Sequence, residues 1–304
     1  MPTVSIVVPC FNAADTLAET LASLRAQSVT DWEMLCVDDG STDATPEMLA
    51  HAARADARIR VIANTGKGPS RARNLGVAEA RGSVIGFCDA DDLWAPDKLR
   101  LCLAALADPA VDAVFARIAF LDGARTSKLS TVPSGDLSVP TLLGENPVCT
   151  MSNLVVRRAA FVATGGFDTG MVHNEDLEWL IRLVGQGSRV IGLDRTLVRY
   201  RTSVSGLSSD LAAMRAGRDR AIATAARHGF VADARSEAIH LRYLARRALR
   251  VGAPGAEALR LAAAGLATSP AGFLSDLRRG GLTALGALLS PLMPARLRRA
   301  LFAS

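Results

Sequence analysis

The 304-residue chain has no hydrophobic run long enough to span a membrane, because none of its apolar stretches approaches the roughly 18 residues that a spanning helix needs. Its first residues carry no basic segment ahead of a short apolar stretch, so we expect no export signal. It has only five cysteines, none of them in C-x-x-C spacing. This pattern predicts neither a disulfide framework nor a zinc site, and we expect reduced core cysteines in a cytoplasmic protein.

Two common nucleotide-binding signatures are also missing. No G-x-G-x-x-G follows the first apolar run, and residues 66–70 fail the G-x-x-x-x-G-K-[ST] spacing, which argues against a dinucleotide enzyme and a P-loop ATPase. The acidic segment that begins at Asp89 has Leu93 at its fifth position and no glycine at its sixth, unlike an EF-hand calcium loop. Aromatic residues are few and do not interleave with the C-terminal arginines, so nucleic acid is not an expected partner.

What the chain does contain is enough apolar material for a large core and an uneven distribution of charge. Hydrophobic residues make up 49% of the sequence, sufficient for one large domain or a domain with an appendage. Residues 245–304 contain nine arginines, one glutamate and one aspartate, so this end carries more than the whole net charge of +5. The remainder is mildly acidic. A basic end on such a body indicates an anionic partner at that end only.

Short β-branched runs alternate with helical stretches from the N-terminus, a rhythm typical of a parallel sheet covered by helices. The pattern predicts strands at residues 4–8, 32–37, 59–62, 84–88, 111–120 and 153–156, the last of them antiparallel. It predicts helices at residues 13–27, 46–55, 70–81 and 174–184, and another after Trp94, with Asp15 or Thr16 capping the first. Beyond residue 206 only helices are expected, with breaks at residues 252–255 and 269–270. We therefore expect an α/β domain over residues 1–209 and a basic helical region over residues 210–304.

Asp89 and Asp91 lie two residues apart at the end of a predicted strand, where an extended backbone projects their side chains to the same side. Adjacent carboxylates repel each other, and a divalent cation relieves this repulsion. Oxygen ligands suit Mg²⁺ or Mn²⁺, which bind one or two carboxylates and share the remaining positions with substrate phosphates. The alternative is an acidic loop that caps the helix after Trp94. We expect Asp92 to be that cap while Asp89 and Asp91 coordinate the metal.

Three further polar segments have two readings each. Residues 38–43 follow the second strand, where an acidic residue can bind a ribose or a base, although a turn with a helix cap explains them equally well. Arg71 and Arg73 either direct donors toward an anionic ligand or lie on a solvated helix face. Glu175 and Asp176 open a helix, a place favoured for acids by the helix dipole, and an aspartate near a diphosphate can also serve as a general base.

Taken together, these segments resemble the family 2 glycosyltransferases, which are inverting enzymes with the GT-A fold. The matches occur in the family's order over residues 3–209: VSIVVPCFN, RAQS, CVDDGSTD, GPSRARNLGVAEARG, GFCDADD, SNLVVRRAAF with GGFD, NEDLEWLIRL, and Tyr200-Arg201 with Ser205 and Ser208 nearby. The resemblance implies a mostly parallel central sheet flanked by helices, of the nucleotide-diphospho-sugar transferase type. The C-terminal helices would then be an appendage to a catalytic domain.

The resemblance also implies where a nucleotide-sugar donor binds. Pro9 and Phe11 would pack near the nucleoside, and Asp39 would bind the base. Asp89 and Asp91 would hold the ribose, the diphosphate and Mn²⁺ or Mg²⁺, with Asp91 as the principal metal ligand and Asp89 on the ribose side.

On the acceptor side, the resemblance implies that Asp176 is the catalytic base and that Glu175 and Trp179 shape the acceptor site. Many relatives carry a histidine shortly after the Tyr-Arg pair, whereas this chain has residues 202–205 as TSVS, which leaves a second protein ligand to the metal open. Arg201 either supplies positive charge to the leaving diphosphate or forms an ordinary structural ion pair.

The expected function is the inverting transfer of a sugar from a nucleotide-diphosphate sugar, most commonly a UDP-sugar, to a hydroxyl of a polysaccharide or glycolipid in cell-envelope glycan synthesis. A sugar nucleotidyltransferase would instead need a glycine-rich loop with a basic residue after the first strand, where residues 9–12 read PCFN. A catalytically inactive nucleotide-sugar-binding homologue would not need both the metal carboxylates and the candidate base, which are present here.

The apolar segment at residues 281–295 carries no charge and is bracketed by arginines. It contains Pro291 and Pro294 and is too short to cross a hydrocarbon core of about 30 Å as a straight helix. It lies either in the headgroup region of an anionic membrane, at that membrane's inner face, or against the catalytic domain or a second subunit. The sequence leaves the oligomeric state open.

Overall fold

The computed structural model describes residues 1–122, 125–202 and 210–302, which form two compact units. The first unit comprises residues 1–137 and 147–202, and the second comprises residues 138–146 and 203–304. The boundary expected after residue 209, together with Ser205 and Ser208, lies outside the described residues. Sequence reasoning did not foresee that residues 138–146 belong to the second unit.

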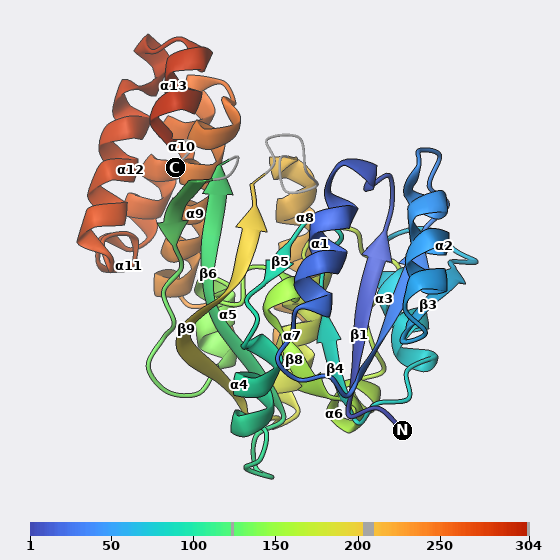
Figure 1. The fold of residues 1–304 in the computed structure, drawn as a ribbon. Coiled ribbons are helices and arrows are strands. Elements are labelled where there is room, and N and C mark those ends of the chain that lie inside the picture. The colour runs from blue at the N-terminus through green and yellow to red at the C-terminus, as the bar shows by residue number, and fades with distance from the viewer. Residues whose placement is uncertain (123–124, 203–209, 303–304) are drawn as a thin grey trace. The chain divides into compact units, whose positions relative to one another are not determined.

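The first unit is built on a nine-stranded sheet (Figure 1). Its strands are β1 (Val4–Cys10), β2 (Trp32–Asp38), β3 (Ile59–Ala63), β4 (Val84–Phe87), β5 (Leu93–Trp94), β6 (Ala113–Asp122), β7 (Arg125–Leu129), β8 (Val155–Arg157) and β9 (Val190–Arg201). They are ordered β3-β2-β1-β4-β8-β6-β9-β5, with β7 paired to β6. The sheet is parallel from β3 through β2 and β1 to β4, and β8 runs antiparallel to both of its neighbours. The carboxyl ends of four parallel strands therefore meet at one edge.

The six strands expected from the sequence are confirmed to within about two residues at each end, as is the antiparallel direction of β8. β9 was not predicted. Its middle residues are exposed or half-buried, so its sequence shows neither the alternation of a half-buried strand nor a continuous apolar run. It becomes a strand because β6 pairs with it along most of its length.

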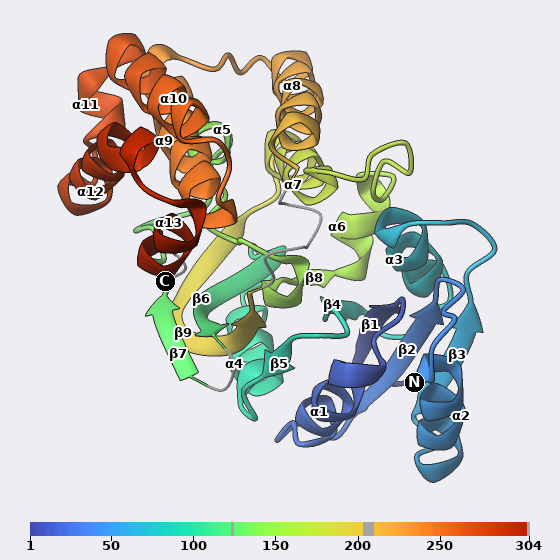
Figure 2. The same ribbon diagram turned by 90° about the horizontal axis from the view of Figure 1, so that it is seen from above.

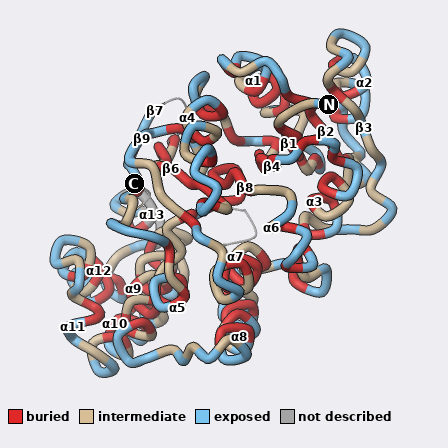
Figure 3. The backbone as a smooth tube through the Cα atoms, turned by 90° about the horizontal axis from the view of Figure 1, so that it is seen from below, coloured by how far each residue is buried: buried red, intermediate tan, exposed pale blue. Residues whose placement is uncertain are grey.

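Helices cover both faces of this sheet (Figure 2). One layer contains α1 (Ala14–Arg25), α2 (Thr45–Ala55) and α4 (Lys98–Ala105), and the other contains α3 (Pro69–Ala78), α6 (Arg158–Ala163) and α7 (Glu175–Gly185). Alternate residues of β1 serve the two layers: Val4 and Ile6 pack with Leu17 of α1, whereas Val7 faces α3. Buried residues accordingly run along the central strands in Figure 3.

Three local expectations are wrong. No side chain caps α1, because its N-cap is Ala13 and Thr16 instead donates to a backbone oxygen of another loop. The helix after Trp94 begins only at Lys98, with Asp97 at the N-cap position, so Asp92 does not cap it. Four cysteines are buried as expected, but Cys149 is exposed.

The second unit consists of helices in its described part. They are α5 (Val139–Gly144), α8 (Leu211–Arg227), α9 (Ala234–Val251), α10 (Gly255–Thr268), α11 (Pro270–Phe273), α12 (Leu277–Leu289), α13 (Ala295–Phe302) and the 3₁₀ turn η3 (Ser290–Leu292). Leu241 and Leu249 of α9, Leu261 of α10 and Phe273 of α11 form its core. The expected breaks are confirmed: α9 ends at Gly252, whose φ of 71° suits glycine, and α11 starts directly after Ser269. Within the described helices, none is long and apolar enough to cross a membrane.

Gly76 sets the distance between α3 and the sheet. A Cβ added at this position would lie 2.4 Å from Cγ1 of Val7 and 3.3 Å from Cγ2 of Val37, both in buried strands. We expect Gly76→Ala to lower the free energy of unfolding by about 1–3 kcal/mol through overpacking, despite the better helix propensity of alanine. Calorimetric unfolding of the full chain measures this change.

Gly281 in α12 is the matched control, because a Cβ added there meets no atom within 4 Å. Gly281→Ala should leave stability unchanged or raise it by up to about 1 kcal/mol. A Gly76→Ala protein as stable as the wild type would contradict the close packing of α3.

Candidate active site

Hydrogen bonds to backbone atoms hold the acidic loop after β4 in place, so its carboxylates are not needed for that purpose. The N–H of Asp89 donates to Oγ of Ser152 (2.8 Å). The hydroxyls of Thr16 and Thr20 in α1 donate to the carbonyl oxygen of Ala90 at 3.0 and 2.9 Å. The loop therefore stands at the carboxyl edge of the parallel strands, where ligands bind in open α/β sheets.

Arg73 joins this loop to the start of α7. Its guanidinium lies 2.7 Å from Oδ1 of Asp89 and 3.0 Å from Oε1 of Glu175, and its side chain is only 7% exposed. Burial opposes its charge, but Asp89 and Glu175 outweigh that effect and raise the pKa of Arg73. The sequence left two readings for Arg73: a solvated helix face, or a donor directed at an anionic ligand. In the structure neither applies, because its guanidinium is buried. It is a buried bridge between two carboxylates.

The three aspartates of the loop have different surroundings. Asp89 is fixed by Arg73 and by the Thr150 hydroxyl, which donates to its Oδ2 at 3.2 Å. Asp91 is exposed on one side, and partial desolvation together with the charge of Asp89 raises its pKa to about 6. Asp92 is fully buried, and only one of its two carboxyl oxygens has a hydrogen-bond partner among the described residues. Burial raises the pKa of Asp92 well above its usual range.

Arg201 at the end of β9 supports the same loop. Its Nε donates to the carbonyl oxygen of Asp91 at 2.8 Å, and its backbone N–H donates to Oδ1 of Asp92 at 3.2 Å. Its guanidinium also pairs with Glu19. The pair with Glu19 is the structural ion pair that was one of the two expected roles of Arg201, and contact with a diphosphate stays a prediction. Of residues 202–205, only Thr202 is described.

Asp176 lies in the first turn of α7, beside Glu175. Asn174 precedes them with a φ of 58°, a left-handed conformation that asparagine tolerates better than most residues. Burial, and next the charge of Glu175, raise the pKa of Asp176 to about 7. A carboxylate with this pKa is suited to accept a proton near neutral pH.

Trp179 does not line a surface. It is fully buried, its Nε1 donates to Oγ1 of Thr164 at 2.8 Å, and its ring lies 5.3 Å from that of Phe161 and 5.1 Å from that of Phe167. It packs α7 against α6, and its expected part in shaping the acceptor site stays a prediction. Glu175 is also buried and bound to Arg73, and its part in an acceptor site stays a prediction.

A second group of candidate residues surrounds Asp39, after β2. Its Oδ1 accepts from Nδ2 of Asn64 at 2.6 Å, and its Oδ2 accepts from the N–H of Gly68 at 2.8 Å. Lys67 donates to the Asp39 carbonyl oxygen and lies 5.4 Å above the Phe11 ring, which is 56% exposed. An exposed aromatic ring beside a fixed carboxylate is a surface on which a nucleoside base can stack and hydrogen-bond.

The two remaining donor-site candidates are less engaged. Pro9 is half-buried in β1, in register with Val37 of β2. Arg71 is exposed, and its side chain lies across Gly66 in the loop before α3. Their contacts with a nucleotide stay predictions.

A divalent cation fits the acidic loop. Asp91 is exposed, and partial desolvation, and next the charge of Asp89, raise its pKa. Bound positive charge would relieve the repulsion between the two carboxylates. In the described part of the chain, no three histidine, cysteine, aspartate or glutamate side chains gather to hold a metal without help. Mg²⁺ and Mn²⁺ need no such cage, since phosphate oxygens and water complete their coordination.

Sequence reasoning missed Thr150 and Ser152, which hold Asp89 in place, and it missed the role of Arg73 as a bridge between carboxylates. Thr150 and Ser152 lie more than sixty residues from Asp89, and Arg73 lies 102 residues from Glu175. The backbone marks the loops of this site in another way: the non-glycine residues with positive φ in the described chain are Asn12, Cys149 and Asn174. All three are in the loops of this site, and strained backbone often accompanies function. Asn offers a hint in sequence, but Cys149 does not.

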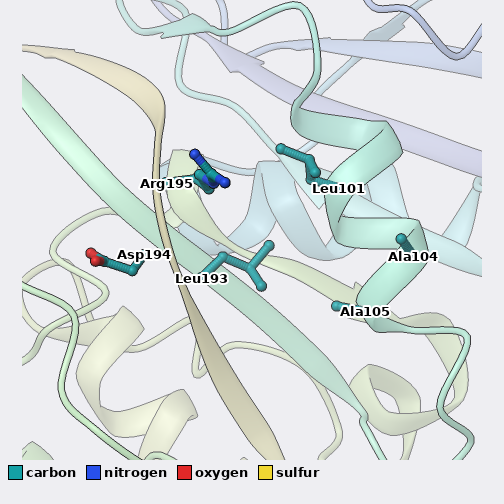
Figure 4. A pocket seen from close by; sticks show the side chains of 6 residues that line it. All are labelled: Leu101, Ala104, Ala105, Leu193, Asp194 and Arg195. Carbon is teal, nitrogen blue, oxygen red and sulfur yellow. The ribbon is translucent and has the colours of Figure 1, made fainter.

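A hollow of 780 Å³ in the first unit lies elsewhere (Figure 4). It is lined by Leu101, Ala104 and Ala105 of α4 and by Leu193, Asp194 and Arg195 of β9. Arg195 is the lining residue nearest in sequence to Arg201, and it is six positions away, or about 20 Å along an extended strand. None of the candidate site residues lines it.

Comparison with known proteins bears on this geometry. The sequence profile described as Glycosyl transferase family 2 matches residues 5–164. TuaG of Bacillus subtilis, named as a teichuronic acid biosynthesis glycosyltransferase, is 29% identical over 69% of this chain and 82% of its own length. The succinoglycan biosynthesis protein ExoO of Rhizobium meliloti is 38% identical over 52% of this chain and 44% of its own length.

Two solved structures share the fold. Staphylococcus aureus TarS 1-349, in complex with UDP-GlcNAc, is 19% identical with a TM-score of 0.62, covering 99% of this chain and 89% of that one. The mannosyltransferase PcManGT of Pyrobaculum calidifontis, in complex with GDP-Man and Mn²⁺, is 23% identical with a TM-score of 0.61, covering 99% and 84%. The expected GT-A type of fold is thereby confirmed. Since the family profile covers more than half of the sequence, the chain belongs to glycosyl transferase family 2 and is a glycosyltransferase.

Proposed function

We propose that the chain is an inverting glycosyltransferase that moves a sugar from a UDP-sugar to a hydroxyl of a cell-envelope polysaccharide or glycolipid. The observation that carries the proposal is the bridge of Arg73, which places the start of α7, with Asp176, beside the acidic loop of Asp89 and Asp91. The named products of two relatives, teichuronic acid and succinoglycan, support a polysaccharide acceptor.

On the donor side, Asp39 and Phe11 would hold the nucleoside, with Pro9 and Arg71 near them. The two solved neighbours carry different nucleotides, and we choose UDP because it is the one in the TarS complexes. Asp91, with Asp89, would hold Mn²⁺ or Mg²⁺, and the Mn²⁺ in the Pyrobaculum enzyme supports this choice. When bound, the cation supplies positive charge to the diphosphate of the donor.

The chemical step would be a single displacement. Asp176 accepts the proton of an acceptor hydroxyl, whose oxygen forms a bond to the anomeric carbon. The bond from that carbon to the diphosphate oxygen breaks, and the nucleoside diphosphate leaves with its electron pair. The configuration at the anomeric carbon inverts because attack and departure take place on opposite faces. The pKa of Asp176, about 7, suits a group that must be ionised to act near neutral pH.

Asp176→Asn tests the base. The change removes the proton acceptor with almost no change in volume, so we expect transfer to fall by about a hundredfold or more while donor affinity changes little. Transfer from a radiolabelled UDP-sugar and donor affinity by calorimetry measure the two effects. Asp97→Asn, at an exposed position paired with Arg100, is the matched control and should keep full activity. Near-normal turnover of Asp176→Asn would reject the assignment.

Asp91→Ala tests the metal and the nucleotide together. In thermal-shift measurements with a panel of nucleotide sugars, the wild type should be stabilised most by a UDP-sugar, and more so with Mn²⁺ than without it. The variant should lose the Mn²⁺-dependent part of this stabilisation, because it lacks the solvent-exposed Asp91 carboxylate that we propose as the principal metal ligand. Equal shifts in the variant and the wild type would remove Asp91 from the metal site, and a larger shift with a GDP-sugar would replace UDP as the donor nucleotide.

The pKa of Asp176 also predicts a change in stability. In the folded chain its pKa is about 7, against an ordinary 3.8, so the folded state binds more protons than the unfolded state between these values. The stability that this group contributes therefore falls as the pH rises through this window. Without ligands, Asp176→Asn should be more stable than the wild type at about pH 8, by on the order of 1 kcal/mol or more, and the difference should shrink at about pH 5.

Urea unfolding at the two pH values measures this difference. The control Asp97→Asn should show no such gain, because Arg100 lowers the pKa of Asp97. An Asp176→Asn variant that is less stable than the wild type at the higher pH would show that ionised Asp176 is not destabilising.

A further inference from the structure

Helix α12 of the second unit and the turn η3 after it expose an unusual number of leucines. Besides Leu277 at the first position of α12, the exposed side chains are Leu282 (51%), Leu285 (54%), Leu288 (63%), Leu289 (43%) and Leu292 (85%). Leu282, Leu285, Leu288 and Leu289 recur at three- and four-residue spacing and so share one side of α12, and Leu292 follows in η3. We call this side, from Leu282 to Leu292, the leucine face.

The opposite side of α12 is buried through small residues. Gly280, Thr283, Gly286 and Ala287 are its buried positions. A Cβ added at Gly280 would lie 2.6 Å from the carbonyl oxygen of Phe273, and one added at Gly286 would lie 2.2 Å from the Phe302 ring. Because only small residues fit there, α12 cannot rotate to bury its leucines in the core of its own unit. A helix of a soluble protein normally has the opposite arrangement.

Next to the leucine face, one arginine is exposed and the neighbouring arginines are paired with acids. Arg278 is exposed at the start of α12, one helical turn before Leu282. Arg279 pairs with Glu145 and Asp276, and Arg242 of α9 reaches the same Glu145. The sequence after Asp276 contains five arginines and no acidic residue.

We propose that the leucine face, with Arg278 at its edge, docks the chain on an anionic lipid bilayer, with α12 lying in the headgroup region. Its 13 residues extend about 20 Å, enough for an interfacial helix and too short for a span. Anionic lipid supplies both the apolar layer for the leucines and the negative charge for the arginines. A second copy of the chain fits less well, because it would bring a second exposed Arg278 against the first, and the sequence after Asp276 has no acid to face it.

The test is flotation of the full chain with phosphatidylcholine vesicles that contain or lack phosphatidylglycerol. We expect the wild type to float with the anionic vesicles, less so at high salt, and not with the neutral ones. The double variant Leu285→Glu, Leu289→Glu should lose roughly tenfold or more in vesicle affinity, because two leucines that the bilayer would bury are replaced by charges that repel the anionic lipid. Both positions are exposed, so folding should be unaffected.

Val231→Glu is the matched control, since Val231 is an exposed apolar residue of the same unit (83%) outside the leucine face. It should float like the wild type. Equal flotation of the double variant and the wild type, or no flotation of the wild type, would overturn the proposal. A wild type that is dimeric by light scattering, does not float, and becomes monomeric in the double variant would assign the leucine face to a second copy instead. Flotation does not measure sugar transfer, so its result is independent of the proposed activity.

Discussion

The candidate site depends on one buried positive charge, the guanidinium of Arg73. Asp89, Asp91, Glu175 and Asp176 come from segments more than eighty residues apart, and like charges at close range in a poorly solvated place are costly. Arg73 offsets part of this cost by pairing with one carboxylate from each segment. Because the guanidinium is planar and has several donors, one side chain contacts both partners and sets the spacing between β4 and α7.

The carboxylates of the candidate site have different surroundings and therefore different roles. Asp89 is fixed by Arg73 and Thr150, Asp91 is left open, and Asp92 is enclosed under the backbone of Arg201. Asp176 lies close enough to other acids, and is buried enough, that its pKa reaches about 7. The same residue type therefore serves as an anchor, a candidate ligand, a structural acid and a candidate base, and the difference lies in what surrounds each one.

In the second unit, the packing of α12 determines which of its side chains are exposed. Its α12 turns glycine, threonine and alanine inward and leucine outward, because close contacts with Phe273 and Phe302 leave no room for larger side chains. The exposed apolar area is thus a consequence of how the helix packs. It is maintained by glycines rather than by any property of the leucines themselves.

The sequence alone was sufficient for the α/β class, the first four strands and most helix positions, because the hydrophobic period is a local property. The roles that the resemblance gave to Asp39, Asp89, Asp91 and Asp176 stay predictions. The sequence was insufficient for β9, for the second-unit placement of residues 138–146 and for the bridge of Arg73. It also misplaced Asp92, which is a buried acid rather than a helix cap, and it gave no sign that Trp179 lies in the core. These features depend on contacts between segments far apart in the chain, and only the packed tertiary structure decides which side chains meet there and which are withdrawn from water.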